Sequence, residues 1–170
     1  MPMSCEPVRG PIWVVSGGRR AIVGYHKIGY ESVYLYLALC FFTGKGFAAF
    51  LPKLNGAFFE WFVEQIDGDL AGPTLFVADG AKAHKSECFE DTHMVFSKLP
   101  PAYPELNRVE RVFLEVRRDL KHRVFSCLQE AQGCVKRVLE ELFCEVGTIV
   151  GLSCFPYITA TLPTLKKATL

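Results

Sequence analysis

A short apolar segment that ends in an acid lies near the middle of the chain, where residues 74–79 read TLFVAD. Its apolar residues follow one another without polar alternation, which is typical of a strand covered on both faces. In open α/β sheets, ligands gather outside the carboxyl ends of such strands. Asp79 therefore occupies a position where a functional side chain is expected.

The segments on either side of this strand alternate between strand and helix patterns, so we predict one α/β domain. Helices are expected to cover both faces of a mixed sheet, and a chain of 170 residues is long enough to bury a core. The expected elements are extended pieces over 11–15 and 20–26, a hairpin of 32–42 and 47–51, a helix over 55–66, a short helix over 84–90, a strand over 93–97, and helices opening at Asn107 and Ser126.

Composition excludes several classes of protein. Half of the residues are apolar and the formal net charge is +1, which argues against disorder and gives no overall sign of a nucleic-acid binder. The longest apolar run, 33–42, is too short to span a bilayer, which takes about 20 residues. Seven cysteines without a C-x-x-C pair favour buried, reduced thiols over disulfides or a zinc site.

A second acid follows the first at a distance that suits a shared site. Residues 99–113 read LPPAYPELNRVERVF, and Glu110 falls in the first turn of the helix expected from Asn107. The intervening chain is long enough for a helix and a strand, so Glu110 could return to the same edge of the sheet as Asp79. Clustered carboxylates hold hard cations such as Mg²⁺, and two such ions about 3.5–4 Å apart can cleave phosphodiesters.

These two motifs, VADGAKAHKS at 77–86 and the run at 99–113, resemble the signature of mariner-like DDE transposases of bacterial insertion sequences. The resemblance extends over about residues 11–160 and implies a ribonuclease H-like three-layer α/β/α fold with a mixed sheet. It also implies that Asp79 and Glu110 are the second and third catalytic acids and metal ligands, holding Mg²⁺ or Mn²⁺ in a two-metal site. The implied substrate is the DNA of transposon ends, cleaved and joined by strand transfer.

The family's first aspartate, which ends the central first strand, has no counterpart here. Glu6 lies on a proline-flanked polar segment and is a poor substitute. The resemblance therefore implies a single catalytic domain, 1–170, truncated at its N-terminal side, with the central first strand missing or replaced by residues 11–25. We expect an impaired metal site and no strand cleavage by this chain alone. The alternative is a non-catalytic remnant that at most binds DNA or a partner subunit.

Further expectations follow from the family rather than from the residues. The partners would be DNA and either a second transposase copy or an upstream-encoded half, with no membrane involved. The location would be the bacterial cytoplasm, in association with the nucleoid. The loop departs from the family pattern at Ala102, Tyr103 and Arg108, and Gly80 stands where asparagine is commoner.

Each candidate residue also has a structural explanation. Glu110 stands three residues after Asn107, as in a capping box, and Asp79 precedes a glycine, as in a turn. His84 is either a helix-start residue or faces the active site.

Basic and aromatic side chains leave further alternatives. Basic residues could form a DNA-binding stripe or a solvated helix face; the candidates are Arg108, Arg111, Arg118, Lys121 and His122. Aromatic side chains are expected to pack in the core rather than stack on bases; they are Phe47, Phe50, Phe58, Phe59 and Trp61.

Overall fold

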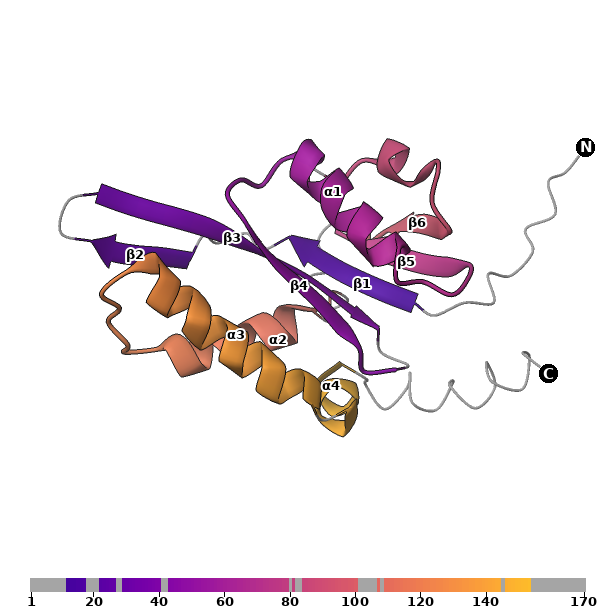
Figure 1. The fold of residues 1–170 in the computed structure, drawn as a ribbon. Helices are drawn as coiled ribbons and strands as arrows, with labels where there is room; N and C mark the ends of the chain where they lie inside the picture. The colour runs from indigo at the N-terminus through magenta and orange to yellow at the C-terminus, as the bar shows by residue number, and fades with distance from the viewer. Residues whose placement is uncertain are drawn as a thin grey trace, which may run out of the picture.

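The computed structural model describes residues 12–17, 22–26, 29–40, 43–79, 81, 84–100, 107, 109–144 and 146–153 (Figure 1). Their order is strands first, then alternating helices and strands, then three helices. The elements are β1 (Ile12–Gly17), β2 (Ile22–His26), β3 (Gly29–Cys40), β4 (Gly46–Leu51), α1 (Gly56–Asp67), β5 (Thr74–Ala78), the 3₁₀ turn η1 (Ser86–Phe89), β6 (Met94–Lys98), α2 (Val109–Leu120), α3 (Leu128–Cys144) and α4 (Val146–Ser153).

All six strands form one mixed sheet, in which the long strand β3 pairs with three others. β1 and β2 both run antiparallel to β3, β1 along its C-terminal half and β2 along its N-terminal half, while β4 pairs with it as a hairpin. β5 and β6 run parallel to each other, and β5 runs parallel to β1. The sheet therefore has the path β2-β3-β1-β5-β6 with β4 beside β3.

β1 fills the centre of the sheet, between β3 and β5. Val14 pairs with Leu39 on one side and with Val77 on the other. Without this strand, the facing backbone groups of β3 and β5 would lose partners, at roughly 1–3 kcal/mol for each buried group. The central position of the sheet is thus occupied by residues 12–17, which lie within the segment 11–25.

Two apolar cores lie on opposite faces of the sheet, as the alternation of side chains along β3 requires. Tyr36, Ala38 and Cys40 face one core, which α1 completes with Phe59 and Phe62. The intervening β3 residues face the other core, which is completed by α2, α3 and α4. Figure 1 shows α1 on one side of the sheet and these three helices on the other, so the predicted three-layer α/β/α arrangement is confirmed.

Local signals in the sequence explain where several elements begin and turn. Asn55 caps α1 as expected, because its side-chain oxygen accepts a hydrogen bond of 3.0 Å from the Phe58 amide. In the β3–β4 hairpin, Gly44 has φ 69°, a conformation that glycine adopts without a steric penalty. The Gly44 amide donates to the Cys40 carbonyl at 2.9 Å and closes the turn.

Three local expectations were wrong. Trp61 lies on the outer side of α1 and is 41% exposed, so it is not a core aromatic. Cys144 is exposed at the end of α3, although all five described cysteines are free, as expected. The Asn107 side chain does not cap α2, because its Oδ1 atom is buried and lacks a hydrogen-bond partner among the described residues.

No helix in the described part of the chain is long and apolar enough to cross a bilayer.

Candidate functional site

Asp79 is placed by β5, whose last residue is Ala78. β5 lies between β1 and β6 and is parallel to both, so its carboxyl end opens on an edge shared by three strands. The Leu99 amide donates to the Ala78 carbonyl at 2.8 Å, which holds the chain leaving β6 next to the chain leaving β5. The prediction that Asp79 follows a strand covered on both faces is therefore confirmed, and β5 lies inside the sheet, beside the central strand β1.

The Asp79 carboxylate is held by groups of the turn that follows it. Its Oδ1 atom accepts a hydrogen bond of 3.2 Å from the Ala81 amide and lies 2.8 Å from Nδ1 of His84. The same Nδ1 atom lies 3.1 Å from the Asp79 carbonyl oxygen. His84 is buried and its ring lies against Phe59 of α1, with the ring centroids 4.4 Å apart. Asp79 thus does start a turn, and His84 is its side-chain partner.

Glu110 lies in the first turn of α2, as the sequence predicted. Buried Val109 and Val112 anchor this helix in the same core that Val77 of β5 lines. The Glu110 carboxylate is partly exposed and pairs with Arg117, two turns along α2, at 3.3 Å. The topology therefore brings Asp79 and the end of β6 to one edge of the sheet, while direct meeting of the two carboxylates stays a prediction.

Within the described residues, the donor set falls short of a complete two-metal site. β1, which occupies the centre of the sheet, reads IWVVSG and carries no acid. Among the residues that the structure describes, no three histidine, cysteine or acidic side chains are grouped as metal binding requires.

Some of the basic side chains expected to bind DNA along α2 form ion pairs with neighbouring acids. Arg118 pairs with Glu115, and just beyond the helix Arg123 pairs with Asp119 at 3.0 Å. Arg111, Lys121 and His122 are exposed, whereas Arg108 lies outside the described residues. Lys121 is exposed at the end of α2, and among the described residues the arginines Arg118 and Arg123 are each paired with an acid.

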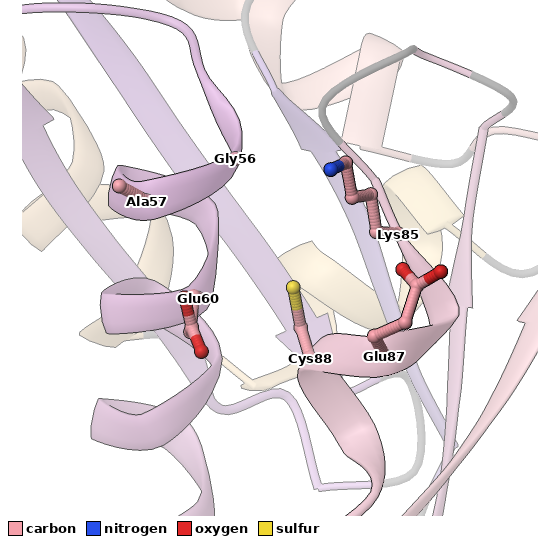
Figure 2. Close-up of a pocket in the computed structure, with 6 residues that line it drawn as sticks. All are labelled: Gly56, Ala57, Glu60, Lys85, Glu87 and Cys88. Carbon is pink, nitrogen blue, oxygen red and sulfur yellow. The ribbon is translucent and has the colours of Figure 1, made fainter.

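A separate pocket of about 310 Å³ lies between the start of α1 and the turn η1 (Figure 2). Its lining combines Cys88 with the acids Glu60 and Glu87 and with Lys85. Burial raises the pKa of the Cys88 thiol above its usual value, and the two carboxylates raise it further. Because the thiolate is the nucleophilic form, a raised pKa disfavours nucleophilic reactivity of Cys88.

Among the contacts of the site that the sequence did not predict, two differ in whether a sequence signal marks them. The pairing of Glu110 with Arg117 could have been predicted from the sequence, because two helical residues separated by seven positions lie on the same face, two turns from each other. The stacking of Phe59 on His84 has no such signal, because it joins a helix to a loop 25 residues later through the tertiary fold.

Comparison with known proteins gives one family and a set of similar folds. The family described as "DDE superfamily endonuclease" matches residues 1–132. No curated protein matches the chain in sequence.

Several solved structures resemble this one across most of its length. The catalytic core domain of BIV integrase has a TM-score of 0.54 at 12% identity, covering 78% of this chain and 83% of that one. The HTLV-2 integrase catalytic core in complex with magnesium, in a dimeric form, has a TM-score of 0.54 at 17% identity, covering 78% and 86%. A simian T-cell lymphotropic virus intasome in complex with PP2A regulatory subunit B56 gamma has a TM-score of 0.57 at 13% identity, covering 78% and 48%. These likenesses confirm the fold: a ribonuclease H-like α/β core.

Proposed function

Because the chain belongs to the DDE superfamily endonuclease family, we propose that it is the catalytic core, over about residues 11–160, of a DNA transposase of the mariner-like bacterial insertion-sequence type. The reaction would be cleavage of DNA at transposon ends followed by strand transfer. Asp79 and Glu110 would be its second and third acids, and Mg²⁺ or Mn²⁺ the ion that such carboxylates attract.

The observation that carries this proposal is the position of Asp79. It follows the parallel strand β5 directly, at the edge where the chain also leaves β6 on its way to Glu110. Ligand-binding residues gather at this edge in open α/β sheets. The structural alternative, a turn-starting aspartate, accounts for the Ala81 hydrogen bond but not for a buried histidine partner.

We propose further that this core is incomplete as a catalyst, since the strand in the central position has no acid. A pair of carboxylates lacks the third, shared ligand that a two-metal site needs. The second candidate is a remnant that binds DNA or a partner subunit without cutting, and the observation behind it is the same acid-free central strand. Exposed Lys121 and His122 are candidate phosphate contacts in either case.

Partners and location are part of the same proposal. Transposon-end DNA and a second copy of the chain, or an upstream-encoded half, would complete the active assembly. Such an enzyme would work in the bacterial cytoplasm at the nucleoid.

The register of β1 identifies where a third acid would complete the set. Val15 pairs with Ala78 in the parallel β1–β5 ladder, so position 16 lies level with Asp79. On its other side, Ser16 of β1 pairs with Leu37 of β3, which is buried in the core under α2. Opposed positions in a sheet share a face, so position 16 lies on the face that α2 covers.

The test is the gain of activity in Ser16→Asp. We expect the unmodified chain to leave supercoiled plasmid DNA intact in Mn²⁺, and Ser16→Asp to nick it at a rate clearly above that background. The matched controls are Ser16→Asn, which has the same shape without the charge, and Ser16→Asp combined with Asp79→Asn. Both controls should return to the background rate.

The outcomes separate the candidates. Metal-dependent nicking by the unmodified chain, abolished by Asp79→Asn, would contradict the claim of incompleteness and leave the transposase assignment standing. A folded Ser16→Asp variant that does not nick would favour the remnant.

A further inference from the structure

Asp79 and His84 form a pair whose side chains differ in their exposure to solvent. The Asp79 side chain is 19% exposed, whereas the His84 side chain is 0% exposed. Nε2 of His84 is buried and has no hydrogen-bond partner in the described part of the chain. A ligand at this edge of the sheet therefore meets the carboxylate and cannot meet the imidazole.

The contacts of Nδ1 determine which ring nitrogen carries the hydrogen. Nδ1 lies 2.8 Å from Oδ1 of Asp79 and 3.1 Å from the Asp79 carbonyl oxygen. Both oxygens are acceptors, so Nδ1 is the donor to each. His84 thus joins the side chain and the backbone of Asp79 through one N–H group.

The ring that makes this bond is itself fixed by the core under α1. It lies 4.4 Å from the Phe59 ring, centroid to centroid, with the planes tilted by 33°. Phe59 is completely buried and meets Phe76 of β5 edge to face at 6.2 Å. The position of Nδ1 is therefore set by side chains packed on the same strand that carries Asp79.

We propose that His84 is a positioning residue for Asp79. Its Nδ1–H and the Ala81 amide hold Oδ1 in one orientation, so that the carboxylate is already oriented before a ligand binds. This inference rests on the proposed role of Asp79 as a ligand-binding acid. Groups that orient a ligating side chain in this way typically change metal affinity by about 10–100-fold when removed.

Two substitutions separate the hydrogen bond from the packing of the ring. His84→Asn places an amide N–H close to the position of Nδ1 and gives up the ring. His84→Phe keeps a ring against Phe59 and gives up the donor. The side-chain rotamer of Asp79 is measured by NMR couplings in the full chain, and thermal unfolding is measured in parallel.

We expect the Asp79 rotamer to stay single in His84→Asn and to become averaged in His84→Phe, even where His84→Phe is the more stable protein. The reverse result, a single rotamer in His84→Phe and an averaged one in His84→Asn, would overturn the proposal. A further check needs no variant: ¹⁵N shifts of His84 in the unmodified chain should place the hydrogen on Nδ1, and a hydrogen on Nε2 would contradict the proposal.

Titration with Mn²⁺ distinguishes this inference from the proposed function. If the unmodified chain binds Mn²⁺, His84→Phe should weaken binding by about 10–100-fold, and His84→Asn should weaken it less. If the unmodified chain and the Ser16→Asp variant both fail to bind Mn²⁺, the metal-binding role of Asp79 fails, while the rotamer measurement still decides whether His84 positions it.

Discussion

At the scale of single residues, Gly46 at the start of β4 lies close to the Phe143 ring near the end of α3. A Cβ atom at position 46 would lie 2.3 Å from Cζ of that ring. Gly46→Ala should therefore lower the free energy of unfolding by about 1–3 kcal/mol, because the ring has to move within a packed core. Urea unfolding followed by circular dichroism measures this loss.

Gly133 provides the matched control for Gly46. It lies inside α3, and a Cβ there meets nothing within 4 Å. Gly133→Ala should raise stability by about 0.5–1 kcal/mol, since alanine is the better helix former. Equal effects at the two positions would mean that the contact with Phe143 does not limit position 46.

The residues of the site could be predicted from the sequence only where a motif or a local pattern marked them. Asp79 and Glu110 were singled out because one follows a covered strand and the other opens a helix. His84 stands five residues after Asp79, a spacing that no helix or strand periodicity relates, so their contact could not be predicted from the sequence. The orientation of Asn107 was mispredicted for a similar reason, because burial beside α2 outweighed its capping preference.

At the scale of secondary structure, the start of α3 makes a prediction about pH. The Glu130 carboxylate accepts hydrogen bonds from the Ser126 hydroxyl at 2.6 Å and from the Ser126 amide at 2.7 Å. These bonds, the hydroxyl first, lower the pKa of Glu130 below its ordinary value. Their contribution to stability is complete above the ordinary pKa of a glutamate and is lost as the pH falls through the lowered value. Glu130→Gln should therefore lower Tm at pH 7, and the difference should vanish in acid.

Glu140→Gln is the control for this measurement. Glu140 is another exposed glutamate of α3, and its partner Lys136 lies 3.7 Å away with both side chains largely in solvent. Exposed pairs of this kind contribute little, so this substitution should hardly change Tm. A Tm for Glu130→Gln equal to that of the unmodified chain at pH 7 would argue against the hydrogen bonds to Ser126.

Helices and hairpins were the elements that could be predicted well, because their signals are local. The apolar spacing of α1 and the glycine turn of the β3–β4 hairpin both gave the observed structure. The same spacing predicted α3, whose buried residues lie on the expected side. The helix expected over 84–90 is shorter and is a 3₁₀ turn, with Phe89 as its buried residue.

At the scale of the whole molecule, stability should depend on β1 more than its six residues suggest. Its backbone pairs with β3 on one side and β5 on the other. Val14→Pro removes an N–H group at the centre of the sheet, where each unsatisfied group costs about 1–3 kcal/mol. We expect a large loss of stability in urea unfolding, since total stabilities are only about 5–15 kcal/mol.

Val14→Ala is the control, because it changes the side chain and keeps the N–H group. Its loss should be the smaller of the two. If Val14→Pro proves as stable as Val14→Ala, β1 would not be a paired central strand.

The placement of β1 is also what the sequence alone could least determine. Residues 12–17 read as a short extended piece, and nothing within them specifies partners at residues 36–40 and 75–78. The partners of β1 are determined by the rest of the sheet, because the unpaired backbone groups of two facing strands can bind an extended segment between them. The sequence therefore left open whether this place would be empty or filled.

The twelve residues of β3 fix the alignment of most of the sheet. Three other strands pair with β3 in a fixed register. Its even-numbered residues from Tyr36 to Cys40 pack in the core under α1, and its odd-numbered residues from Leu35 to Leu39 pack in the core under α2. A shift of β3 by a single residue would send Tyr36 and Leu37 to each other's sides and spoil both cores at once. One inserted or deleted residue in this strand should therefore disrupt the packing on both faces of the sheet, whereas the same change in a surface loop is tolerated.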